Sequence, residues 1–207
     1  MKNVKTRYLI GIIAVAVVAL LAIGRFTSRP IPPPQNVDPK ALAGIQNGTA
    51  PWQPEIEHLI DRLRAIGLPA LSQEGTVLHI HQHLDMFIHR EHISIPASIG
   101  INEGARFISA LHTHDTSAVV HVESPVAQDF TLGQFFDIWG VRFDKECLGG
   151  YCNDGANMLK VFINGAAFAG DPRSLVLAPH QEIVVTYGTE EELPTPLPAS
   201  YSFDPGV

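Results

Sequence analysis

The sequence predicts an α+β domain with a mixed or antiparallel sheet and one or two packed helices, preceded by one transmembrane helix. Three patterns carry this prediction. Residues 8–24 form an uncharged apolar stretch of 17 residues, which is near the lower limit for a helix that spans a bilayer. Apolar residues recur at helical spacing over 56–66, and from residue 76 they alternate with polar residues, as in a strand with one buried face.

The first 27 residues are interpreted as a signal anchor. Lys2, Lys5 and Arg7 precede the apolar stretch, and the positive-inside rule then places the following domain on the extracytoplasmic side of the cell membrane. A cleaved signal peptide, which would give a secreted protein, is the alternative. Both interpretations export the domain. Residues 28–51 include a run of prolines and are expected to form a stiff linker between the membrane and the domain.

The charge of the chain beyond the anchor argues against a nucleic-acid partner. From residue 30 onward, nine basic residues stand against 21 acidic ones, a net charge of −12 with histidine neutral. Nucleic-acid binding requires basic patches on the protein surface. The expected contacts are with the membrane, through the N-terminal helix, and with cations, which an acidic surface concentrates. The sequence identifies no protein partner for metal transfer.

The domain is expected over residues 52–188, and its first element is a helix opened by Pro51 to Pro54. One apolar face of this helix is marked by Ile56, Leu59, Ile60, Leu63 and Ile66. Gly67 followed by Pro69 is a conventional helix stop. The apolar face is expected to pack against the rest of the domain.

Two hairpins are expected after this helix. The first strand runs from residue 76 to 88, turns near Arg90 and returns through 92–95. Its apolar residues are Leu78, Ile80, Leu84, Met86 and Ile88, with Gln82 as the only interruption. Side chains alternate between the faces of a strand, so this set should pack on the core. Residues 106–112 and 118–123 form the second candidate hairpin.

The second half of the domain is expected to contain one helix and two strands. A capping-box sequence at Thr131 opens a short helix that Gly140 ends. Strands over 158–163 and 182–187 follow, with Asn164-Gly165 as a tight turn. An acidic, proline-rich tail over residues 189–207, expected to be mostly unstructured, closes the chain.

The order hairpin, helix, strand, short hairpin, strand over residues 106–188 resembles a β-grasp arrangement. Residues 76–101 would then add an extra N-terminal hairpin to the same sheet. A resemblance at the level of the fold carries no information about function.

Eight of the ten histidines lie between His79 and His121, and most are two residues apart. Alternate residues of a strand share one face, about 7 Å apart, so flexible imidazoles there can converge on one cation. Imidazole is the commonest protein ligand of zinc and copper. The pattern therefore predicts a metal site formed by His79, His81, His83, His112, His114 and His121. Three acidic residues are candidate ligands or hydrogen-bond partners of these imidazoles, namely Asp85, Asp115 and Glu123.

The expected cofactor is a divalent metal ion, zinc or copper(II), and the expected role is metal binding or delivery. The first alternative is a zinc-dependent hydratase or hydrolase, in which three imidazoles leave a coordination position open for water. The second is an interaction domain without metal, whose histidines are structural or sense pH. Whether the protein is an enzyme stays open.

The two cysteines, Cys147 and Cys152, are separated by a glycine-containing loop. Exported thiols tend to oxidise, so a disulfide is expected. A pair of thiolate metal ligands is the alternative.

Overall fold

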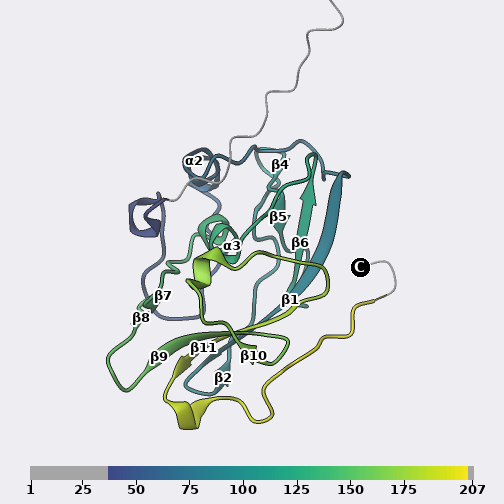
Figure 1. The fold of residues 1–207 in the computed structure, drawn as a ribbon. Helices are drawn as coiled ribbons and strands as arrows, with labels where there is room; N and C mark the ends of the chain where they lie inside the picture. Colours follow the sequence, from purple (N-terminus) through teal and green to yellow (C-terminus); the bar gives the residue numbers. More distant parts are fainter. Residues whose placement is uncertain (1–36, 205–207) are drawn as a thin grey trace, which may run out of the picture. The chain divides into compact units, whose positions relative to one another are not determined.

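The computed structural model describes residues 37–204, which form an α+β domain that is mostly sheet with two α-helices (Figure 1). The predicted signal anchor, residues 1–27, and the proline run that follows it lie outside the described residues. Among the described residues, none of the helices has the length and apolar character required to cross a bilayer.

The main sheet has seven strands and is mixed (Figure 1). Six strands follow the order β10-β9-β11-β1-β6-β5, and β2 pairs with β1. Only β1 and β11 are parallel, and the other neighbours are antiparallel. The bounds are β1 Leu78–Ile88, β2 Glu91–His92, β5 Leu111–His112, β6 Val119–Ser124, β9 Met158–Ile163, β10 Ala166–Ala167 and β11 Glu182–Gly188. Two small sheets pair β3 Ile101–Asn102 with β4 Phe107–Ile108 and β7 Cys147–Leu148 with β8 Tyr151–Cys152.

The position of β1 corrects the predicted arrangement of hairpins. We expected residues 76–101 to add a hairpin to the sheet, with residues 106–112 as the first strand of its β-grasp-like part. Instead β1 lies in the middle, because its 11 residues are long enough to pair with β6 over 78–83 and with β11 over 83–88. The predicted strand over 106–112 is divided, since β4 pairs with β3 and only β5 pairs with β6.

The helices are α2 Leu59–Ala65 and α3 Leu132–Trp139, with short 3₁₀ turns η1 Pro39–Ala41, η2 Pro172–Ser174 and η3 Glu190–Glu192. The helix α2 begins later than predicted. The Glu55 carboxylate accepts the backbone N–H of His58 at 3.2 Å, which ends the preceding loop one residue before the helix. The helix α3 has the predicted capping box at Thr131 and ends at Gly140, whose φ is 82°.

The two faces of β1 differ in chemistry, as the alternating pattern predicts. Leu84, Met86 and Ile88 are buried in the apolar core, where they belong to the same cluster as residues of α3 such as Phe135 and Trp139. Gln82 interrupts this face and is fully buried, with neither amide atom hydrogen-bonded. The opposite face carries the histidines, and Tyr201 of the C-terminal tail packs on His83 there.

Two flanking segments that we expected to extend from the domain contact it instead. In the linker, Leu42 is buried in the core and Gln46 bridges to Val141. In the tail, the Tyr201 ring stacks on the His83 ring with a centroid distance of 3.8 Å. Apolar and aromatic side chains in both segments gain burial by packing, which a proline-rich composition does not prevent.

Candidate metal centre

Three adjacent strands bring the two sequence-separated histidine groups to one face of the sheet. His79 and His81 lie on β1. His121 and Glu123 lie on β6, and His112 lies on β5. The register pairs His81 with His121 across β1 and β6, and His112 with His121 across β5 and β6. His114 follows β5 and completes the group. We call these six residues, His79, His81, His112, His114, His121 and Glu123, the histidine centre.

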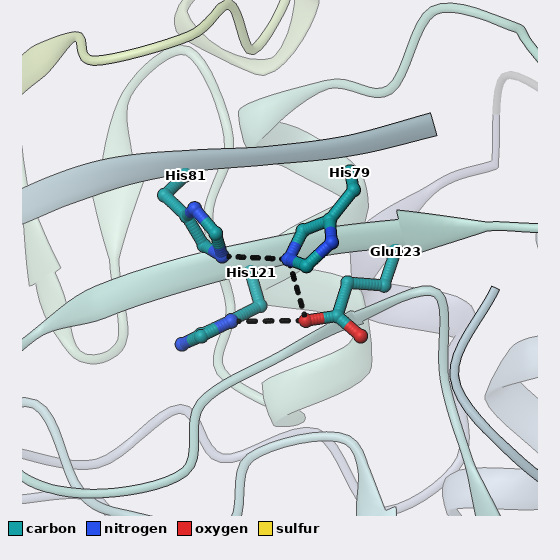
Figure 2. A group of neighbouring side chains, drawn as sticks. All are labelled: His79, His81, His121 and Glu123. Atoms are coloured by element: carbon teal, nitrogen blue, oxygen red, sulfur yellow. Dashed lines mark hydrogen bonds and ion pairs between the residues drawn. The ribbon is translucent and has the colours of Figure 1, made fainter. Parts of the chain in front are cut away.

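Figure 2 shows four side chains of the histidine centre, those of His79, His81, His121 and Glu123, converging. His79 Nε2 lies 3.1 Å from His81 Nε2 and 3.3 Å from Glu123 Oε1. His121 Nδ1 lies 3.1 Å from the same Glu123 oxygen. A tetrahedron of ligands around zinc, with bonds of 2.0–2.1 Å, has edges of about 3.3 Å. These three separations are close to such an edge, and all four ligand atoms lie within 4.8 Å of one another.

A second group of four contains His112, His114, His121 and Glu123, and within each group the ligand atoms lie within 4.8 Å of one another. His112 Nε2 is 3.1 Å from His114 Nε2 and 3.9 Å from Glu123 Oε1. Since both groups include His121 and Glu123, the centre can hold one ion with histidines to spare or two neighbouring ions that share these ligands.

A backbone carbonyl fixes the tautomer of the most deeply buried imidazole. His112 Nδ1 lies 3.0 Å from the carbonyl oxygen of Ser109, and His112 is fully buried. A carbonyl only accepts hydrogen bonds, so Nδ1 carries the proton and Nε2 presents its lone pair to the centre. Metal-binding histidines are commonly oriented by such a second hydrogen bond.

Burial favours the neutral form of three imidazoles in the centre, those of His81, His112 and His121. Burial and the neighbouring His114 lower the pKa of His112 to about 3. Burial and His81 lower the pKa of His121 to about 4, and burial with His79 also lowers the pKa of His81. Metal binding requires the neutral imidazole, so at neutral pH these ligands have no proton to release before an ion enters.

The Glu123 carboxylate of the histidine centre pairs with imidazoles. Within residues 37–204, the ion pairs of Glu123 are with His79, His112 and His121, and none is with lysine or arginine. Burial and the nearby Glu74 raise the pKa of Glu123 to about 7. The raised pKa means that this position disfavours the ionised carboxylate, and a cation bound beside it would favour that form.

The remaining predicted residues lie outside the histidine centre. His83 faces Val119 across β6 and groups instead with Asp85 and Glu182. Asp115 accepts the backbone N–H of Ser117 at 2.8 Å, as a turn residue does. The structure thus brings together five of the six predicted histidine ligands. Of the three acidic candidates, it brings Glu123 to the same centre.

Sequence reasoning missed three residues near these sites. Glu182 begins β11 and contacts His83, Glu74 lies 3.5 Å from His114, and Tyr201 covers His83. A signal for Glu182 was present, because it is a charged residue at the start of an apolar strand. Glu74 and Tyr201 stand in irregular segments, where no periodicity marks them.

A pocket of about 240 Å³ opens beside the centre. Its lining includes His114, Asp115 and His121 on one side and Tyr201 and Asp204 of the tail on the other. The pocket gives a small molecule access to the edge of the histidine centre.

The sulfur atoms of Cys147 and Cys152 lie 2.08 Å apart, at disulfide distance, on the hairpin of β7 and β8. Neither cysteine belongs to a group of converging metal-ligand atoms among the described residues.

No family model, no curated protein and no solved structure matches this chain. The histidine/acid groups could hold a metal ion, and this inference depends on the residues and their geometry alone.

Proposed function

We propose that this protein binds zinc or copper(II) at the histidine centre and serves as a metal carrier or delivery module. One observation carries the proposal: five imidazoles and one carboxylate converge from neighbouring strands, and the ion pairs of that carboxylate are with histidines only. Buried polar groups normally find a hydrogen-bonding or charged partner. An incoming cation is the partner that suits every member of this set.

The choice of metal follows from the donor atoms. Nitrogen-rich sites favour copper(II) on the divalent affinity series, and the tetrahedral spacing of the first group suits zinc. Exposed ligands at the rim support exchange of the ion, since the side chains of His79 and His114 are 52% and 43% exposed. An ion that enters and leaves through this rim is what a delivery role requires.

A zinc-dependent hydratase or hydrolase is the second candidate, and the pocket beside His114 and His121 favours it. Such an enzyme would leave one coordination position open to water, whose pKa the metal lowers to about 7. A domain without metal, with structural or pH-sensing histidines, is the outcome if no ion binds.

For location we propose a single-pass anchor over residues 1–27 with the domain on the extracytoplasmic side. The uncharged apolar stretch and the preceding basic residues support this proposal. The cysteine pair at disulfide distance is in keeping with an oxidising compartment. For the fold we propose a β-grasp-like core in which β1, rather than residues 106–112, is the first strand, since the order β9-β11-β1-β6 sets β1 parallel to the last strand.

Elemental analysis of the full-length chain tests the metal proposal. The chain is extracted in detergent, freed of any tag and purified without chelator. We expect near-stoichiometric zinc or copper, which His121→Ala abolishes because both ligand groups lose a member. His89→Ala is the matched control, since His89 also pairs with a glutamate, Glu192, but lies outside the centre. Absence of metal after incubation with either ion would overturn the proposal.

Transfer and turnover assays separate the two metal-dependent roles. A carrier gives up its ion to a competing chelator within the time of mixing and shows no turnover. An enzyme retains its ion and hydrates carbon dioxide or hydrolyses an activated ester, with loss of activity in His121→Ala.

A further inference from the structure

A second cluster of ligand atoms lies farther along the polar face of β1. His83 and Asp85 project from β1, and Glu182 projects from β11, where the parallel register pairs it with His83. His83 Nδ1 is 2.9 Å from Glu182 Oε2, and the ligand atoms of all three residues lie within 4.8 Å of one another. His92 Nε2 contacts the Asp85 carboxylate at 3.0 Å.

This cluster is separate from the histidine centre. His83 belongs to neither group of four in that centre, and its neighbour on β6 is the apolar Val119. The nearest imidazole on the same face of β1 is His81, two residues away, a separation of about 7 Å along a strand. The ligand atoms of His83, Asp85 and Glu182 form a group of their own, which shares no residue with the histidine centre.

The cluster is largely buried, and within residues 37–204 no lysine or arginine pairs with its carboxylates. Glu182 is 1% exposed and His83 is 7% exposed. Among the residues that the structure describes, none forms a hydrogen bond with the buried Glu182 Oε1. Among residues 37–204, Asp85 and Glu182 form ion pairs with histidines only. A buried carboxylate oxygen without a partner is costly unless a cation or a donor reaches it.

We propose that His83, Asp85 and Glu182 form a second cation site, distinct from the histidine centre and beyond the function proposed above. Its donors are two carboxylates and one imidazole, which suit a harder divalent ion such as manganese better than copper. The Tyr201 ring stacks on His83 at 3.8 Å and covers this end of the face. The two sites on β1 therefore select cations of different chemical class.

Manganese titration of the metal-free full-length chain tests the site, with the electron paramagnetic resonance signal of free Mn²⁺ as the readout. We expect one bound Mn²⁺ in the unmodified chain and at least tenfold weaker binding in Glu182→Gln. The same variant keeps its zinc or copper at the histidine centre. Glu123→Gln is the matched control, and it should lose zinc or copper while Mn²⁺ binding is unchanged.

Asp85→Asn provides a second variant, because Asp85 is more exposed than Glu182 and its replacement is less disruptive to folding. It should weaken Mn²⁺ binding in the same direction. Unchanged Mn²⁺ affinity in both variants, or loss of Mn²⁺ in Glu123→Gln, would overturn the second site. Zinc or copper content measured on the same samples reports on the histidine centre independently, so the two proposals fail separately.

Discussion

Two buried polar regions of this domain have opposite chemistry, although both are largely hidden from solvent. At the α2 end, Arg62 is fully buried, pairs with Glu55 and donates to the carbonyls of Ala43 and Ile138 at 3.0 and 3.1 Å. At the histidine centre, five imidazoles and the Glu123 carboxylate converge, and no arginine or lysine pairs with Glu123 in residues 37–204.

The difference separates a structural ion pair from a candidate binding site. Around Arg62 the chain supplies the cation and the oxygen atoms that accept hydrogen bonds from both terminal guanidinium nitrogens, and Nε alone donates to none of the described residues. Around Glu123 the described residues supply imidazoles but no lysine or arginine, so a cation from outside is the charge that would favour the ionised carboxylate. Burial of a charged residue alone would not distinguish the two regions.

The largest expected effect on stability is at the Arg62 region. Arg62→Met should lower the free energy of unfolding by about 3–5 kcal/mol, because it leaves the partly buried Glu55 and two backbone carbonyls without their buried cationic partner. Urea denaturation measures the loss. Arg64→Met, on the same helix but exposed, should change it by less than about 0.5 kcal/mol. Equal effects of the two substitutions would remove the contrast between a buried pair and a surface pair.

Metal bound at the histidine centre should raise the free energy of unfolding of the protein by a comparable amount. Zinc present at about 100 to 1,000 times its dissociation constant raises the free energy of unfolding by about 2.7–4.1 kcal/mol, since it binds the folded state. Thermal unfolding with zinc and with chelator measures this increment. The increment should vanish in His121→Ala and persist in Arg64→Met. An equal melting temperature with zinc and with chelator would mean that the histidines need no ion.

The same substitution should have opposite signs in the two regions. In metal-free protein, Glu55→Gln should lower the free energy of unfolding by about 1–3 kcal/mol, because the charge-assisted bond to Arg62 is lost. Glu123→Gln should raise it by about 1 kcal/mol, because a neutral amide replaces a carboxylate whose charged form burial and Glu74 disfavour. Parallel denaturation curves test the pair, and a common sign would refute the comparison.

The smallest expected effect is a pH dependence at the Arg62 region. Burial opposes ionisation of Glu55, but the bonds from Arg62 and His58 outweigh it and lower the pKa of Glu55 below 4.5. A lowered pKa in the folded state means that this stabilisation is present above pH 4.5 and is lost as the pH falls through the folded-state value. Stability between pH 5 and pH 3 should therefore fall less in Glu55→Gln than in the unmodified chain, and parallel profiles would contradict the assignment.

The sequence predicted what depends on local order along the chain. The alternation from Leu78 to Ile88 predicted both faces of β1, and the capping box predicted the start of α3. The spacing of the histidines also predicted which face they share. These features require only the geometry of a single strand or helix.

The features that sequence reasoning missed depend on which strands become neighbours. His83 was grouped with His79 and His81, but the register places Val119 beside it on one side and Glu182 on the other. That register follows from β11 pairing in parallel with β1 across about 100 residues of chain. The same non-local pairing places β1 in the middle of the sheet, where we had predicted only an added hairpin.

The alternation of β1 also restricts how this protein can change in length. Core residues and ligands of both sites occupy successive positions between His79 and Met86. Deletion or insertion of one residue there would turn every following side chain to the opposite face, bringing imidazoles into the apolar core and Leu84 to the ligand side. Gains and losses of residues are therefore expected in loops such as 93–100, while β1 can alter its ligands only by replacement at fixed positions.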